Sequence, residues 1–379
     1  MVKNKIAQTI QMAGPDVGAL EASVVADAMA SGWYEPNAYK YVEQFESEFA
    51  AFHDRLFGLM TPNCTTAIHL VLAGLGIGPG DEVIAPESTW VGSTAGITHS
   101  GASTVFADID ENTWCLSKQS VQAVTTARTR AIVAVDLYGN MPRWKSLEEY
   151  SAETGVVLIE DAAEALGSIY KGVRAGKYGK ASVFSFHRTK TLTTGEGGML
   201  LVDDPDLYER CKFLRDHGRA PGSYLNTEVA YKYMPSNVQA AIGHGQFMRI
   251  DELIQIKRET FLRYRSNFAH TSGLQLNEES EDLVNGAWAT AVVFSPETRV
   301  TSTYMMKELP KQGVPVRPFF YPLSSLPAYV NNSSGGSKRN PIAYDAAGRG
   351  IHLPCAMNLT TDQIDYISET ILDLTDKGA

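Results

Sequence analysis

The sequence predicts an α/β protein with a large, mostly parallel sheet domain and a smaller α+β domain at its C-terminal end. Its 379 residues are too many for one ordinary core and suit two domains. Between about residues 56 and 220, short apolar runs alternate with helical patterns, as in βαβ units. Past residue 237 this alternation ends and longer helical patterns follow.

The alternation in the first part of the chain predicts helices and strands in turn. Apolar residues at helical spacing predict helices over 65–75, 90–97, 118–124 and 143–154. Mostly continuous apolar runs predict strands over 82–85, 104–107, 131–135 and 156–159. Such runs are typical of parallel strands, which are covered on both faces.

The second part predicts the smaller domain. Residues 238–269 are expected to form one or two long helices. The later patterns predict a strand over 288–294 and helices over 303–312 and 361–375. We therefore divide the chain into a large domain with an N-terminal arm, 1–245, and a small domain, 246–379. The polar run from Asn331 to Ser337 predicts a solvent-exposed loop.

Composition narrows the possible partners and the compartment. The formal net charge of -10 argues against a nucleic-acid partner and against an anionic membrane surface. No apolar run approaches the ~18 residues needed to cross a bilayer. The four cysteines are far apart and lack metal-ligand spacing, which predicts reduced thiols, no metal site and a cytoplasmic protein.

Lys190 and Asp161 are the candidate catalytic pair. Asp161 follows the apolar run 156–159, and ligands of parallel sheets bind at the carboxyl ends of strands. Lys190 follows the next strand-like run and precedes the glycine-rich stretch Thr193–Gly198. A lysine can hold pyridoxal 5'-phosphate (PLP) as a Schiff base, and an aspartate can keep its pyridine nitrogen protonated. Taken singly, Lys190 could be a surface charge and Asp161 a helix cap.

Four further residues are candidates for holding the cofactor. Thr65 and Thr66 open a helix, whose free N–H groups and hydroxyls suit a phosphate, although from this feature alone a plain helix cap is the more common explanation. Ser185 lies five residues before Lys190 and could add a hydroxyl. Trp90 could stack on the pyridine ring, although an aromatic at a helix start is more often core packing.

Several segments, in this order, resemble the PLP-dependent sugar aminotransferases of the DegT/StrS type. The resemblance covers about residues 41–367. Its most specific pieces are Gly78–Pro86, Leu137–Gly139, Ile159–Ser168, Phe184–His187, Lys190 and Thr193–Gly198. Many members have Gln at position 164. Glu164 instead resembles the perosamine-synthase-like branch of the family. The segment Arg317–Leu323 resembles one that closes the active site in this family.

The resemblance implies a fold-type-I aminotransferase and a homodimer with shared active sites. It implies that Lys190 is the Schiff-base lysine and that Asp161 pairs with the pyridine nitrogen. It makes Thr65, Thr66 and Ser185 phosphate ligands, Trp90 the stacking aromatic and Glu164 a contact of the cofactor. Three departures from the family pattern stand out. Asp136 and Ser324 each replace a frequent histidine, and Lys232 and Met234 stand in a segment that often reads Tyr-Asn-Tyr-Arg.

These observations together predict a nucleotide-sugar aminotransferase that uses L-glutamate as the amino donor. The expected acceptor is a nucleotide-linked keto-sugar, a 4-keto-6-deoxyhexose, with a GDP-perosamine-type product. Arg317, Tyr321 and His187 are the candidate substrate contacts, since an arginine suits a diphosphate; a structural ion pair is the alternative for Arg317. Two other functions are open: a sugar dehydratase of the same family, which Lys190 disfavours, and a non-catalytic regulator with this fold.

Overall fold

The large unit is built on a seven-stranded sheet. The computed structural model describes residues 9–220, 222–329, 331 and 334–378. The strand order is β1-β9-β8-β5-β4-β2-β3, and every neighbouring pair from β3 to β8 is parallel, whereas β9 runs antiparallel to β8 and β1. The bounds are β1 Phe57–Thr61, β2 Glu82–Pro86, β3 Ser103–Ala107, β4 Thr129–Val135, β5 Val157–Asp161, β8 Ala181–Ser185 and β9 Gly198–Val202.

Helices cover both faces of this sheet, which explains the continuous apolar runs of its strands. Val83 and Ala85 of β2 pack on one side, whereas Ile84 between them packs on the other. The first face is covered by α3 (Cys64–Gly74), α4 (Gly92–His99) and α7 (Pro205–Arg215). The second is covered by α2 (Lys40–Phe52), α5 (Lys118–Val124), α6 (Trp144–Thr154) and α8 (Asn237–Phe247), with α1 (Ala19–Ser31) packed on α8.

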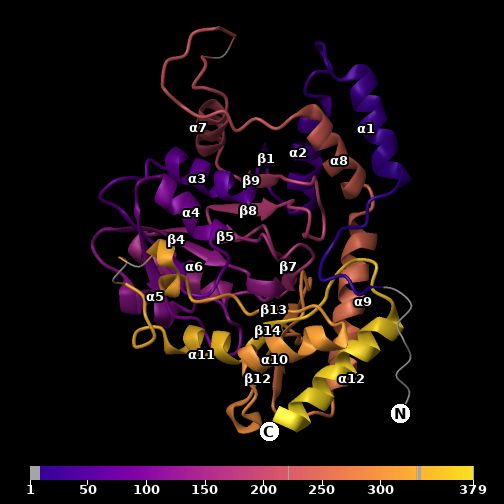
Figure 1. The fold of residues 1–379 in the computed structure, drawn as a ribbon. Coiled ribbons are helices and arrows are strands. Elements are labelled where there is room, and N and C mark those ends of the chain that lie inside the picture. The colour runs from indigo at the N-terminus through magenta and orange to yellow at the C-terminus, as the bar shows by residue number, and fades with distance from the viewer. Residues whose placement is uncertain (1–8, 221, 330, 332–333, 379) are drawn as a thin grey trace.

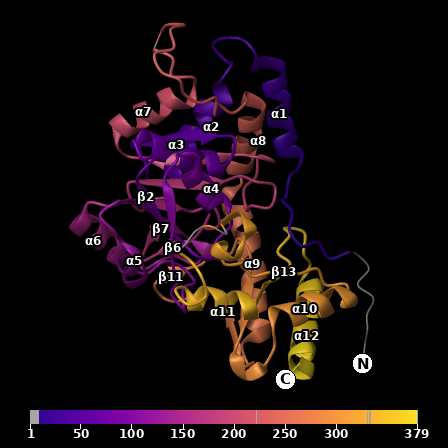
Figure 2. The ribbon, with the colours of Figure 1, turned by 60° about the vertical axis from the view of Figure 1, so that its left-hand side comes forward.

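The smaller unit has its own sheet and its own core. Its strand order is β10-β12-β14-β13, all antiparallel, with bounds β10 Leu274–Leu276, β12 Ala291–Phe294, β14 Gly350–His352 and β13 Arg317–Pro318. Its core takes side chains from α9 (Ile250–Phe268), α10 (Ser302–Glu308) and α12 (Thr361–Gly378). In both views α9 runs from the large unit down to this one (Figure 1, Figure 2).

Two further clusters join the units. A small sheet pairs β6 (Ile169–Tyr170) with β7 (Val173–Arg174) and with β11 (Leu283–Val284). An apolar cluster brings Tyr138 of the large unit against Trp288, Phe319 and α11 (Pro341–Arg349). The chain's beginning also crosses over, because Ile10 lies in the small unit's core and Met12 O accepts a hydrogen bond from Cys355 N.

The predicted elements are found with small shifts at their ends. The helix expected at residue 90 begins at Gly92, so Trp90 lies in the loop before it. Of the strand expected from 288 to 294, only the second half, Ala291–Phe294, is extended as β12. Ala287 has a φ of 52°, so the chain turns just before Trp288. The helix expected to end at residue 312 changes to 3₁₀ geometry at Leu309, where Pro310 removes an N–H donor.

The loop expected between 331 and 337 is less exposed than predicted. Asn332 and Ser333 lie outside the described residues, but Ser334, Gly335 and Gly336 are only partly exposed. Ser334 Oγ accepts a hydrogen bond from Phe106 N of β3 at 2.9 Å, so this run docks on the large unit. Among the helices that the structure describes, none has the length and apolarity that a membrane crossing requires.

Candidate active site

The candidate residues gather at the edge of the large sheet where its parallel strands end. Asp161 is the last residue of β5 and Ser185 the last residue of β8. Val135 ends β4, and Asp136 N donates to Asp161 O at 3.0 Å, so the loop after β4 begins beside Asp161. This edge is the expected ligand position of such a sheet.

Lys190 and Glu164 form the most direct polar contact of the site. Lys190 Nζ lies 3.1 Å from Glu164 Oε1, and both side chains are largely buried. Glu164 Oε2 accepts the backbone N–H of Tyr138 at 3.0 Å. Burial raises the pKa of Glu164, and the Lys190 ammonium opposes that rise. The glutamate therefore holds the lysine side chain on one side and the loop after β4 on the other.

An aromatic ring lies against the same lysine. Lys190 Nζ is 3.9 Å from the centroid of the Trp288 ring, which is cation–π geometry. The Trp288 indole N–H donates to Thr189 O at 2.8 Å, so the ring is fixed to the loop that carries the lysine. The small unit thus contributes one wall of the site.

Asp161 is buried and held in one orientation. Its side chain is 1% exposed. Oδ2 accepts the Ser93 hydroxyl at 2.7 Å, and Oδ1 accepts Ala163 N at 3.1 Å. Cys64 Sγ lies 3.7 Å from Oδ1. Burial raises the pKa of Asp161, while the Ser93 hydroxyl and the Ala163 N–H stabilise the charged form and oppose that rise.

The start of α3 and the end of β8 form a cradle of polar groups. Ser185 pairs with Gly198 in the β8–β9 ladder. A Cβ at Gly198 would lie 2.5 Å from the carbonyl carbon of Asn63 and 2.6 Å from Cys64 N, so only glycine allows β9 to approach the first turn of α3 this closely. Ser185 is therefore brought next to the N-terminus of that helix.

The two threonines of that helix differ in their surroundings. Asn63 is the N-cap, and its Oδ1 accepts Thr66 N at 2.9 Å. The Thr66 hydroxyl donates back to Asn63 O at 2.8 Å, so it already takes part in the cap. Thr65 Oγ1 faces Gly92, where a Cβ would lie 3.0 Å away. Thr65 thus points toward the loop that carries Trp90.

The Trp90 ring is exposed to solvent and does not pack in the core. Its side chain is 63% exposed, and its ring centroid lies 6.2 Å from that of Phe320 in the small unit. His187 is half-buried: its Nδ1 lies 2.8 Å from Thr189 Oγ1, and burial lowers its pKa. Its Nε2 lies 3.7 Å from Glu196 Oε1.

Arg317 and Tyr321 lie on the small unit's side of the site. Arg317 pairs with His352 across β13 and β14, and its side chain is exposed. Across the described part of the chain, Arg317 forms no ion pair with a carboxylate, so the structural ion pair considered for it is not found. Tyr321 is 57% exposed. Both side chains are free to meet a ligand.

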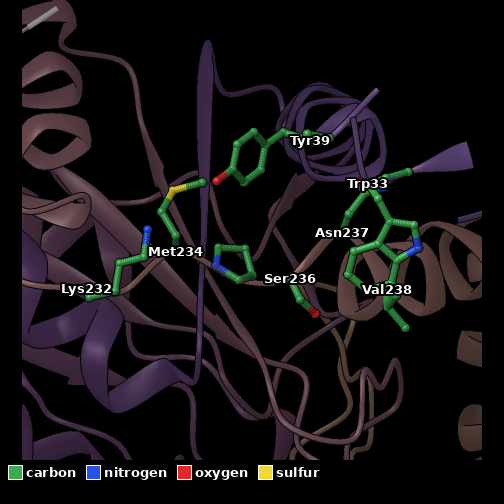
Figure 3. A pocket seen from close by; sticks show the side chains of 10 residues that line it. Trp33, Tyr39, Lys232, Met234, Ser236, Asn237 and Val238 are labelled. Carbon is green, nitrogen blue, oxygen red and sulfur yellow. Dashed lines mark hydrogen bonds between the residues drawn. The ribbon is translucent and has the colours of Figure 1, made fainter. Parts of the chain in front are cut away.

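The segment around Met234 lines a pocket away from Lys190. The pocket has a volume of about 370 Å³, and Figure 3 shows Lys232 and Met234 on one side and Trp33 and Val238 on the other. Tyr39, Pro235 and Ser236 complete much of the wall. Lys232 Nζ lies 2.6 Å from Asp216 Oδ1, so within the described chain this lysine is already paired.

Asp136 forms a pair of buried carboxyls with Glu160. Asp136 is fully buried, and its two oxygens have no well-formed hydrogen bond to any of the described residues. Burial and the neighbouring Glu160 raise its pKa well above the ordinary value. Burial also raises the pKa of Glu160 to about 7, although Gly176 N and Tyr178 N donate to its carboxylate. The pair is therefore expected to keep a proton near neutral pH.

Three contacts of the site were not predicted from the sequence. Ser93 holds Asp161, Trp288 lies under Lys190, and Tyr138 connects Glu164 to Phe320. Ser93 lies in the first turn of α4, and Trp288 lies shortly before β12. Neither residue type is distinctive at such a position, so the sequence held little signal for either contact. Tyr138 lay in the recognised Leu137–Gly139 segment, but its contacts depend on the small unit.

The residues brought together here are those needed to bind PLP. A lysine and a buried carboxylate come from neighbouring strand ends, as a Schiff base and a pyridine nitrogen need. The α3 N-terminus, narrowed by Gly198 and bordered by Ser185, offers N–H donors to a phosphate. The Lys190 amine, the Asp161 carboxylate and the N–H groups of α3 are thus complementary to the aldehyde, the ring nitrogen and the phosphate of the cofactor.

Comparisons with known proteins agree with this chemistry. Residues 15–372 match the model of the DegT/DnrJ/EryC1/StrS aminotransferase family. GDP-perosamine synthases of Escherichia coli O157:H7 and Vibrio cholerae are each 35% identical over 94% of this chain and 96% of theirs. A Streptococcus pneumoniae chain assigned as a sugar aminotransferase, Spr1654, was solved in its PMP form and superimposes with a TM-score of 0.90 at 27% identity, covering 98% of each chain.

The buried carboxyl pair predicts a distinctive dependence of stability on pH. Because folding raises both pKa values, the folded chain binds more protons than the unfolded chain above about pH 4. The free energy of unfolding should therefore fall as pH rises toward 7 and beyond, by about 1.4 kcal/mol per pH unit for each extra proton. Asp136→Asn removes one acid and should flatten this fall.

Thermal unfolding of the wild type and Asp136→Asn between pH 5 and 9 measures this effect. The variant should gain melting temperature relative to the wild type as pH rises. The control Glu369→Gln removes an exposed carboxylate and should leave the slope unchanged. Parallel curves for the wild type and Asp136→Asn would contradict the shared proton.

Proposed function

Because the chain belongs to the DegT/DnrJ/EryC1/StrS aminotransferase family, we propose that it transfers an amino group from L-glutamate to a nucleotide-linked 4-keto-6-deoxyhexose. It is a PLP-dependent aminotransferase whose substrates are an amino donor and a keto-sugar. The observation that carries the residue assignment is the 3.1 Å contact between Lys190 Nζ and Glu164, next to the buried Asp161.

We assign the cofactor contacts from these positions. Lys190 would hold the cofactor's aldehyde carbon covalently, and Asp161 would hold a proton at the ring nitrogen. Thr65, Ser185 and the N–H groups of α3 would bind the phosphate, with Thr66 acting through the helix cap more than through its hydroxyl. Trp90 would cover the ring, and Glu164 would keep the lysine amine in place.

The proposed mechanism gives Lys190 two proton transfers. When bound, PLP supplies an electron sink for the electrons left behind as a C–H bond breaks. In the first half-reaction, Lys190 Nζ would take the proton from the α-carbon of glutamate and pass it to the cofactor carbon that carried the aldehyde oxygen. In the second, it returns a proton to the sugar carbon that gains the nitrogen. Glu164 limits the movement of Nζ, and Trp288 excludes water from one side of it.

The acceptor is proposed to yield a GDP-perosamine-type product. The support is the 35% identity to two GDP-perosamine synthases over nearly the whole chain, together with Glu164. Arg317, free of ion pairs to the described carboxylates, is suited to the diphosphate, and Tyr321 and His187 offer polar groups to the sugar. The presence of Lys190 disfavours a dehydratase. Its contact with Glu164, beside the buried Asp161, likewise disfavours a regulator that has lost catalysis.

The active form is proposed to be a homodimer with shared sites. Tyr224, Leu225 and Val229 extend from the large unit between α7 and α8 with highly exposed apolar side chains, and Trp33 and Tyr39 line the pocket of Figure 3. Large apolar side chains exposed in this way are typical of an interface. Lys232 would reach a neighbouring phosphate only by leaving Asp216.

Two further parts of the proposal concern domains and compartment. The boundary between residues 245 and 246 lies in the last turn of α8, shortly before α9. Helix α9 carries side chains into both cores: Ile250 into the large one and Phe268 into the small one. We keep that boundary, with residues 10–14 packed on the small domain. A cytoplasmic location rests on the cysteine spacing in the sequence.

The first prediction is that Lys190 carries the cofactor. Borohydride reduction in the presence of PLP, followed by peptide mapping, should place the label on Lys190. Lys190→Ala should lose the label and lower turnover by about 10³-fold or more, since the amine acts in both half-reactions. Lys180→Ala, a surface control, should keep both. A label on another lysine would overturn the assignment.

The second prediction identifies the acceptor. GDP-, dTDP- and UDP-linked 4-keto-6-deoxyhexoses should be incubated with the enzyme and L-glutamate, with products measured by mass spectrometry. The GDP-linked sugar should give the highest kcat/KM. Arg317→Ala should raise KM for that sugar by about tenfold or more and leave KM for glutamate nearly unchanged. Equal effects on both substrates would mean that Arg317 is structural.

The third prediction concerns assembly. Sedimentation of the holoenzyme should show a dimer, because the exposed apolar side chains of Tyr224, Leu225 and Val229 need a partner surface. Tyr224→Ser together with Leu225→Ser should weaken that dimer and its activity in parallel. A fully active monomer would refute shared sites.

A further inference from the structure

A buried carboxylate, Glu87, fixes the small domain's residues 319–324 to the large domain. Glu87 follows β2 directly and is fully buried. Its main-chain carbonyl accepts Leu323 N at 2.8 Å, and the adjacent Ser88 forms an antiparallel bridge with Pro322. Residues 87–88 thus pair with residues 322–323 as a short ladder between the domains.

Among the described residues, the Glu87 side chain accepts hydrogen bonds from neutral donors of the small domain. Oε1 accepts Ser324 N at 2.7 Å, and Oε2 accepts the Asn340 side-chain amide just before α11. Asn340 is also buried. Over the described ranges, no lysine or arginine pairs with Glu87. A buried carboxylate with neutral donors depends strongly on both hydrogen bonds.

The loop expected to be open to solvent closes this contact. A Cβ at Gly335 would lie 2.2 Å from Ser324 Cβ and 2.7 Å from Glu87 Oε2, so the backbone of Gly335 packs directly on both residues. Ser324 Oγ also lies 3.0 Å from Tyr344 Oη of α11. Four separate parts of the chain therefore meet at the Glu87 carboxylate, and water has little access to it.

Residues 319–324 connect this anchor to the reactive lysine. Phe320 stacks on Tyr138 with ring centroids 5.1 Å apart and planes 2° from parallel, and Phe320 N donates to the Tyr138 hydroxyl at 3.1 Å. Tyr138 N is bound by Glu164, which contacts Lys190. Tyr321, the next residue, is exposed on the same stretch. A shift of this stretch would move Tyr321 and Phe320 relative to Trp90 and Lys190.

We infer that Glu87 is a positioning residue for the acceptor: its bonds to Ser324 and Asn340 hold residues 319–324 where the sugar nucleotide binds. The inference rests on the proposed function in taking a sugar nucleotide as the acceptor. The amino donor is smaller and reacts at Lys190, so it depends less on residues 319–324.

The test reverses the donor and acceptor of one hydrogen bond. Asn340→Asp places a second carboxylate against Glu87 where water is scarce, so the two repel. It should raise KM for the GDP-linked sugar by about tenfold, with kcat and the glutamate half-reaction within about twofold of wild type. Adding Glu87→Gln should restore KM, because the new amide can donate to the carboxylate at position 340 and its carbonyl can accept Ser324 N.

Two measurements and one control make the result decisive. Hydrogen exchange of the backbone amides of residues 319–324 should speed up in Asn340→Asp and return in the double variant. Asn267→Asp is the matched control, because Asn267 donates to Asp365 between α9 and α12, far from the site. It should change neither KM nor this exchange.

The outcomes separate this inference from the proposed function. Wild-type exchange in Asn340→Asp, or no recovery in the double variant, would overturn the role of Glu87. An equal loss in both half-reactions would also overturn it, since a general structural defect affects donor and acceptor alike. If the wild type aminates none of the sugars, the proposed acceptor fails, whereas the exchange data still decide whether Glu87 holds residues 319–324.

Discussion

The structure of the site depends on the carboxylate of Glu164. One oxygen holds the Lys190 amine and the other holds Tyr138 N, so the lysine and the loop after β4 are fixed by one side chain. Tyr138 has a positive φ of 55°, which costs energy for a tyrosine and is sustained by such contacts. Its ring stacks on Phe320 and lies parallel to that of Trp288. The position of Lys190 is therefore coupled to the small domain.

Four buried acids surround the ends of β4 and β5, and the cost of their burial is compensated in different ways. Asp161 and Glu164 are held by hydrogen bonds and by the nearby lysine. Glu160 is bound by two backbone N–H groups, and Asp136 faces Glu160. Glu87, at the end of β2, relies on neutral donors from the other domain. The acids proposed to bind the cofactor are thus close to acids whose partners all belong to the protein.

The departures from the family pattern have identifiable surroundings. Ser324 lies close to Gly335, where an added Cβ would collide with the Ser324 side chain. Lys232 pairs with Asp216, and Met234 lines an apolar pocket. Asp136 forms the acid pair. None of these four residues touches the Lys190–Glu164 contact, so the departures are separate from the residues proposed for the cofactor chemistry.

The sequence alone determined the fold class and the alternation of helices and strands between residues 65 and 159, because apolar periodicity is a local feature. It also selected Lys190, Asp161 and Glu164 as candidates, and the structure brings them together. It placed the strand over 131–135 correctly, yet it treated the stretch from Asn331 to Ser337 as open and missed Ser93, Trp288 and Glu87. Those roles arise from contacts between residues more than sixty positions apart. Only the tertiary structure decides them, since serine, tryptophan and glutamate carry no local signal until folding brings their partners into contact.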